Sequence, residues 1–96
     1  MREIFYNANS KDEFNRVSNT LQANGFEWVG FNKNPSFEEC KCWLHGNAKL
    51  VIHAFFNSIN KKYEIQFGSR AIYNSYPQHR RSGIVVVDMP IGEMED

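Results

Sequence analysis

The sequence has no excess of charge of either sign, because eleven Lys and Arg residues balance eleven Asp and Glu residues. This balance argues against a general nucleic-acid coat protein, whose affinity comes mainly from excess positive charge. It also argues against an acidic mimic of DNA. The balanced total charge is still compatible with a local basic patch.

Long hydrophobic runs are also missing, since no stretch approaches the about 18 apolar residues that a membrane span needs. Residues 1–10 lack the apolar core of a secretory signal, so we expect no leader, no membrane contact and a cytoplasmic location. The only two cysteines are Cys40 and Cys42. In a cytosolic chain we expect neighbours at this spacing to stay reduced.

What the chain does contain is a high share of aromatic residues, 15% of a total of 96. A chain of this length forms one domain with one core, so the aromatic rings must supply much of that core. We expect a single α+β domain at residues 1–90, followed by an acidic C-terminal tail at residues 91–96.

The clearest local signals lie at the N-terminal third of the chain. Ser10 and Glu13 form the S-x-x-E pattern of a capping box, and Gly25 is suited to the left-handed stop position of a helix. Between them an apolar stripe recurs at helical spacing, on Phe14, Val17 and Leu21. These signals predict a helix at residues 10–24 and a strand at residues 26–31.

The remaining segments of alternating or β-branched character predict strands at residues 2–6, 40–45, 48–56, 63–67 and 83–89. Gly46-Asn47 is typical of a two-residue hairpin turn, which would place Cys40 opposite His53 and Trp43 opposite Leu50. The last strand is apolar on both faces, which favours a central position. The predicted fold is α+β, with one N-terminal helix on a mostly antiparallel sheet of about five to six strands in β-α-β-β-β-β order.

The predicted hairpin brings a weak metal candidate together on one face, namely Cys40, Cys42 and His53. Thiolates and imidazole are zinc ligands, but three ligands without a fourth make an incomplete structural site. We favour the alternative that both cysteines are buried as small hydrophobic residues. A Cys40–His53 nucleophile pair would lack an orienting third group. We therefore expect no catalytic residue, no cofactor and no enzymatic activity.

The best candidate site is the irregular segment at residues 69–82, which contains no acidic residue. Its arginines can bind phosphate or carboxylate groups, and its tyrosines can stack on bases or anchor a protein interface. The residues assigned to partner or phosphate binding are Arg70, Tyr73, Tyr76, His79, Arg80 and Arg81. The alternative is a solvated basic loop that only offsets the acidic tail.

The pattern of residues 1–31 resembles small α+β early proteins of tailed bacteriophages. The matching residues are Ser10, Lys11, Glu13, Phe14, Leu21, Gly25, Phe26 and Trp28. The resemblance implies a protein of the host cytoplasm that binds and disables or redirects a host factor, such as a bacterial defence protein. It implies no catalytic residues.

These observations favour a small non-enzymatic binding protein that acts by occluding a host protein, as a monomer or homodimer. One alternative is recognition of a nucleic acid or a nucleotide through the same arginines and tyrosines. Another is an antitoxin or immunity protein, which would use the same physical contacts against a toxin.

Overall fold

The computed structural model describes residues 3–30, 34–45, 47–78 and 81–85. Its strands are β1 (Glu3–Asn7), β2 (Glu27–Trp28), β3 (Leu50–Asn57), β4 (Lys62–Ser69) and β5 (Arg81–Val85). Its helices are α1 (Lys11–Ala23), α2 (Phe37–Trp43) and α3 (Arg70–Ser75). The predicted α+β class is confirmed, whereas the predicted single helix and β-α-β-β-β-β order are wrong.

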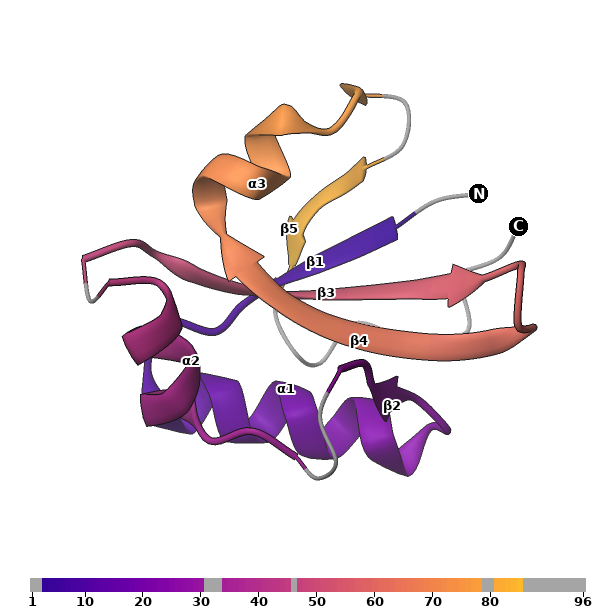
Figure 1. The fold of residues 1–96 in the computed structure, drawn as a ribbon, viewed down its shortest axis with the longest axis horizontal. Coiled ribbons are helices and arrows are strands. Elements are labelled where there is room, and N and C mark those ends of the chain that lie inside the picture. The colour runs from indigo at the N-terminus through magenta and orange to yellow at the C-terminus, as the bar shows by residue number, and fades with distance from the viewer. Residues whose placement is uncertain (1–2, 31–33, 46, 79–80, 86–96) are drawn as a thin grey trace.

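The strands form one mixed sheet in the order β2-β4-β3-β1-β5 (Figure 1). The long pairs β1–β3 and β3–β4 are antiparallel, while β1–β5 and β2–β4 are parallel. The last strand therefore lies at an edge of the described sheet, beside β1, and the predicted central position is wrong. Residues 86–89 of the predicted strand and the predicted tail at 91–96 lie outside the described residues.

Helix α1 follows its sequence signals closely. The Ser10 side chain accepts a hydrogen bond from the Glu13 amide, and Gly25 has φ +92°, the left-handed conformation that glycine adopts without strain. The amides of Gly25 and Phe26 donate to the carbonyls of Gln22 and Leu21, which completes a Schellman stop.

The predicted strand at residues 40–45 is wrong, because this segment is helix α2. Ser36 caps it, and the Glu39 side chain accepts from the Ser36 amide, so a complete capping box starts the helix. Apolar residues at helical spacing face the core, namely Phe37, Cys40 and Leu44. The packing of this face on α1 and the sheet outweighs the strand-like composition of the segment.

A polar junction fixes α2 against the ends of two strands. The side-chain oxygen Oδ1 of Asn9 accepts from Lys41 Nζ at 2.9 Å and from the Leu50 amide at 3.1 Å. Lys41 Nζ also donates to the Ala48 carbonyl at 2.7 Å. One lysine and one asparagine therefore tie the start of α1, helix α2 and the start of β3 together.

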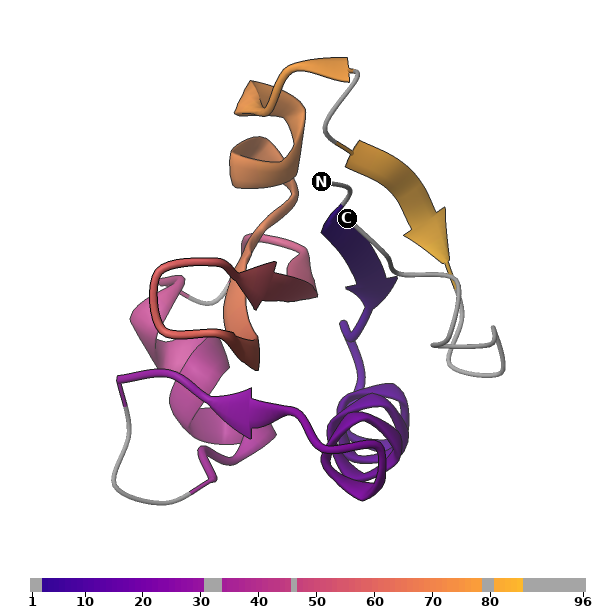
Figure 2. The same ribbon diagram turned by 90° about the vertical axis from the view of Figure 1, so that its right-hand side faces the viewer.

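Helices α1 and α2 cover one face of the sheet and α3 lies across the other (Figures 1 and 2). We call these the α1 face and the α3 face. The α1 face carries the apolar core, which includes Ile4, Tyr6, Phe14, Val17, Leu21, Leu50, Ile52, Ala54 and Ile65. Each large side chain buried there stabilises the fold by roughly 1.5–3 kcal/mol. The α3 face instead carries rings and polar groups.

In the described part of the chain, no helix combines the length and the apolar character that crossing a bilayer requires.

Candidate functional site

Aromatic rings cover the centre of the α3 face. Phe5 and His53 stack with their centroids 4.3 Å apart and their planes nearly parallel, and Phe55 continues the stack at 4.8 Å from His53. Tyr73 and Tyr76 meet Phe5 edge-on, at 4.8 and 5.4 Å. The register places Phe5 and His53 directly opposite each other on β1 and β3. The sheet therefore sets the spacing of the rings, and α3 with its C-cap Tyr76 closes over them.

His53 is held by polar contacts on both ring nitrogens. Its Nε2 lies 3.1 Å from Glu3 Oε1, and its Nδ1 lies 2.9 Å from Gln66 Nε2. Glu3 and Gln66 therefore hold the imidazole ring in place from its two sides. His53 on β3 thereby links Glu3 on β1 to Gln66 on β4.

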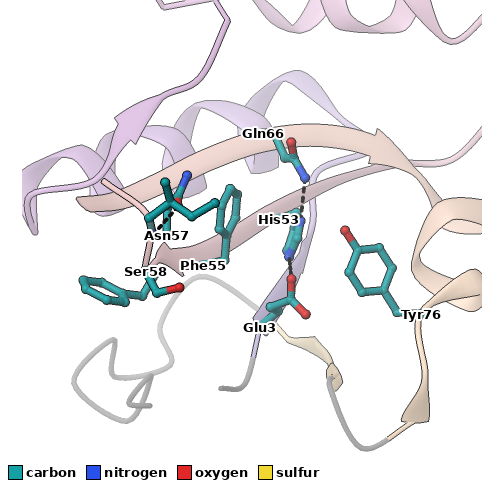
Figure 3. A pocket seen from close by; sticks show the side chains of 9 residues that line it. Glu3, His53, Phe55, Asn57, Ser58, Gln66 and Tyr76 are labelled. Carbon is teal, nitrogen blue, oxygen red and sulfur yellow. Dashed lines mark hydrogen bonds and ion pairs between the residues drawn. The ribbon is translucent and has the colours of Figure 1, made fainter. Parts of the chain in front are cut away.

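A pocket of about 270 Å³ opens beside this contact and is called the Glu3 pocket. Figure 3 shows that Glu3, His53 and Gln66 form its polar side, with the Tyr76 ring across from them. Phe55 supplies a second aromatic side. The turn after β3 completes the pocket, at Asn57, Ser58 and Ile59. The Glu3 carboxylate is only 5% exposed, so it forms part of the pocket floor.

A second buried carboxylate stiffens the wall of the Glu3 pocket. Glu64 lies opposite Phe55 in the β3–β4 register, on the α3 face. Its two oxygens accept from Asn57 Nδ2 at 2.9 Å and from Asn60 Nδ2 at 2.8 Å. Asn57 Oδ1 also accepts from the Ile59 amide, so the turn is bonded into one conformation. This part of the molecule therefore carries two carboxylates with fixed positions.

The residues that the sequence assigned to binding are only partly brought together. Tyr73 and Tyr76 are half-buried on Phe5, and Arg70 is exposed with its guanidinium 5.9 Å from the centre of the Tyr73 ring. Arg81 is in β5 with its Cα opposite that of Glu3. The predicted residues His79 and Arg80 lie outside the described residues.

The predicted metal candidate is separated by the fold. Cys40 is buried in the core under the α1 face, Cys42 is exposed on α2, and His53 belongs to the α3 face. The predicted register of Cys40 against His53 is wrong, because the partners of β3 are β1 and β4. No three His, Cys, Asp or Glu side chains form a metal-sized group in the described segments. Burial, with a smaller effect of the Glu39 charge, raises the pKa of the Cys40 thiol to about 12.

A second hollow lies at the end of α2. It has a volume of about 440 Å³ and is lined by Glu39, Cys42, Trp43 and His45. Trp43 is 69% exposed, and its predicted position opposite Leu50 is wrong because Leu50 pairs with Ser69. The helical geometry of α2 explains this, because Trp43 points away from the stripe that faces the core.

Sequence reasoning missed Glu3 and Gln66 as site residues. A signal was available for each, since Glu3 is a charged residue directly before the run Ile4-Phe5-Tyr6 and Gln66 alternates with Ile65 and Phe67. What the sequence did not contain was the pairing of β1 with β3, which puts Glu3 next to His53.

Comparison of this chain with protein-family models, with curated proteins and with solved structures gave no match.

Proposed function

We propose that this chain is a non-catalytic binding protein that contacts another protein through a surface on α3. This docking surface consists of Arg70, Ile72, Tyr73 and Tyr76. The observation that carries the proposal is the edge-on packing of both tyrosines on Phe5. It holds two half-buried rings in place before any partner arrives.

Preorganised rings favour binding because little side-chain entropy is lost on association. Tyrosine and arginine are also the residue types that dominate binding energy at protein interfaces. Arg70 is exposed beside Tyr73, and Ile72 is 47% exposed on the same short helix. The docking surface therefore combines a positive charge, an aliphatic group and two fixed aromatic groups.

The resemblance of residues 1–31 to bacteriophage early proteins supports a host protein as the partner. A bacterial defence factor in the host cytoplasm, inhibited by occlusion, is the proposed target. Arg81 and the neighbouring His79 and Arg80 extend the proposed contact region along the chain.

The test compares two charge-matched double variants in partner capture from a host lysate. Arg70→Glu/Ile72→Asp changes the docking surface, and Arg16→Glu/Val29→Asp makes the same kinds of change at exposed positions in α1 and after β2. We expect capture to fall at least about tenfold for the first variant only, since removed hot spots typically cost 2 kcal/mol or more. Circular dichroism of both variants checks that they are folded.

Three outcomes would contradict the proposal. Unchanged capture by folded Arg70→Glu/Ile72→Asp would show that the partner does not bind at the docking surface. Loss of capture by Trp43→Ala alone would place the interface at the end of α2. Capture of nucleic acid, with an affinity that falls steeply as salt rises, would favour the alternative in which Arg70 contacts phosphate.

A further inference from the structure

Two exposed cations lie side by side at the end of the sheet where β3 begins. The Arg70 amide donates a hydrogen bond to the Lys49 carbonyl at 3.0 Å, which continues the β3–β4 ladder one step beyond the pair of Leu50 with Ser69. Figure 1 shows the start of β3 and the end of β4 together beneath α3. Both residues are exposed, and we call Lys49 and Arg70 the cation pair.

The pleat of the sheet places the cation pair on the α3 face. Side chains at every second position of a strand share one face, so Lys49 lies on the same side as His53, and Arg70 on the same side as Gln66. The Cα atoms of a hydrogen-bonded antiparallel pair are about 5.5 Å apart, so the two side chains leave the backbone close together. The Arg70 guanidinium lies 5.9 Å from the centre of the Tyr73 ring, which keeps its charge beside α3.

Within the described residues, no ion pair involves either member of the cation pair. Two other exposed lysines do have a carboxylate partner, since Lys11 lies 3.9 Å from Glu38 and Lys62 lies 3.8 Å from Glu27. Like charges directly opposite each other on neighbouring strands destabilise a sheet. The free chain therefore keeps an unfavourable contact, which an added carboxylate between the two cations would make favourable.

An apolar side chain borders the cation pair. Ile72 lies over Gly68, since its Cδ1 is 3.2 Å from the position that a Cβ on Gly68 would take. Gly68 precedes Arg70 by two residues, so Ile72 and the Arg70 backbone occupy neighbouring parts of the α3 face. Ile72 is still 47% exposed. A partner that reaches the cation pair therefore also meets an aliphatic surface.

Carboxylates of a protein suit this arrangement better than nucleic-acid phosphates do. An arginine fork binds either group with two parallel hydrogen bonds. The affinity of nucleic-acid binding, however, grows with the number of phosphates neutralised, and this chain offers a net charge of zero. Two cations beside the half-exposed Ile72 instead fit a short segment that combines acidic side chains with an apolar one.

We infer that the cation pair binds carboxylate side chains in an acidic segment of the partner protein, an inference that rests on the proposed function. Arg70 already belongs to the docking surface, and Lys49 extends that surface across the sheet to the start of β3. The carboxylates of the partner lie between the two cations, where they end the repulsion. An apolar residue of the same segment packs on Ile72.

The first experiment uses small probes and needs no partner. The acidic probe acetyl-Glu-Glu-Leu-Glu-amide is titrated into the full chain, and the backbone amide signals of Lys49 and Arg70 are followed by NMR. Acetyl-Gln-Gln-Leu-Gln-amide is the matched control probe, because it has the same shape without the charge. A short oligothymidylate serves as the nucleic-acid probe. We expect the acidic probe to bind about tenfold more tightly than either of the others, because two ion pairs form at once.

Two charge-matched variants locate the binding. Lys49→Gln/Arg70→Gln removes both charges of the cation pair and is expected to abolish the preference for the acidic probe. Lys61→Gln/Lys62→Gln removes two neighbouring exposed charges where β4 begins, and is expected to leave the preference unchanged.

The single variant Lys49→Gln tests the repulsion in the free chain. It should raise the midpoint of urea denaturation, because the remaining Arg70 no longer faces a like charge. In the capture assay the same variant should bind the partner about threefold more weakly, since one exposed ion pair is lost. A residue with a purely structural role would instead lower the urea midpoint when it is replaced.

Equal binding of the two peptides, or a preference that persists in folded Lys49→Gln/Arg70→Gln, overturns the inference. Tighter binding of the oligothymidylate also overturns it, and so does a fall in the urea midpoint of Lys49→Gln. Since the titrations contain no partner, failure of the docking surface would show in the capture assay and leave the probe result intact. Capture that Arg70→Glu/Ile72→Asp weakens and Lys49→Gln leaves unchanged would keep the docking surface and exclude the acidic segment.

Discussion

The two faces of the sheet carry different kinds of side chain. The α1 face holds aliphatic and aromatic side chains that are almost completely buried, packed under two helices that each begin at a serine N-cap. The α3 face holds a stack of rings around a histidine and a carboxylate, covered by one six-residue helix. The first arrangement gives stability, whereas the second keeps polar groups and open volume that stability alone does not require.

The largest expected effect tests whether stability resides on the α1 face. Phe14 is 1% exposed and packs against Trp28 and Phe37, so Phe14→Ala should lower the free energy of unfolding by about 3–5 kcal/mol. Phe55→Ala on the α3 face removes the same ring from a half-buried position and should cost about 1 kcal/mol. Urea denaturation of both variants measures the difference. Equal losses in the free energy of unfolding would show that the α1 face and the α3 face contribute alike to stability.

A smaller effect tests the polar centre of the α3 face. His53→Phe keeps a ring between Phe5 and Phe55 but removes the contacts with Glu3 and Gln66. Leaving these buried polar groups beside a hydrocarbon should cost about 1–3 kcal/mol.

The control for this effect is a double-mutant cycle with Gln66→Leu. The two changes should be coupled by about 0.5 kcal/mol or more, because the side chains touch at 2.9 Å. Additive losses would show that the stacked ring of His53, and not its nitrogens, matters for stability.

The smallest expected effect tests whether the Cys40 thiol is closed off from water in the core on the α1 face. Burial raises the pKa of this thiol from its ordinary value of 9.0 to about 12, so the folded state favours the neutral form. Below pH 9 the thiol is neutral in both the folded and the unfolded chain, and its burial does not lower the stability. As the pH rises from 9 toward 12, only the unfolded chain ionises the thiol, so the free energy of unfolding falls.

We expect the wild type to lose about 1 kcal/mol more than Cys40→Ala between pH 9 and pH 10. Urea denaturation at the two pH values measures this difference. In native protein at pH 8, iodoacetamide should modify the exposed Cys42 rapidly and Cys40 only through unfolding. Rapid modification of both thiols would show that the core under α2 is open.

Local signals explain which parts of the fold the sequence predicted. Helix α1 was predictable because its cap, stripe and Gly25 stop all lie within one short stretch. Helix α2 carried the same type of signal, Ser36 followed by Glu39, but its cysteines and Trp43 resemble a strand and Gly46-Asn47 resembles a hairpin turn. At α2 the contact of Phe37, Cys40 and Leu44 with the core decided between the two structures.

Of the candidate site, only the tyrosines on and after α3 were predictable from the sequence. Tyr73 and Tyr76 were suggested by residue type and by their place in a segment without acidic residues. Their support by Phe5, and the contact of Glu3 with His53, depend on strand pairing between distant segments. No local pattern encodes which strand lies beside which, so the floor of the Glu3 pocket could not be derived from the sequence.

The pairing of β1 with β5 joins the two ends of the described chain. Of the described strands, β1 is synthesised first and β5 last, so the edge of β1 that pairs with β5 has no strand partner until β5 has left the ribosome. Contacts between such distant segments also form slowly, because a long loop must close before they do. Glu3 lies in β1, with its Cα opposite that of Arg81. A chain that stops before β5 therefore leaves the strand that carries Glu3 with one edge unpaired, although the described residues that line the Glu3 pocket all precede β5.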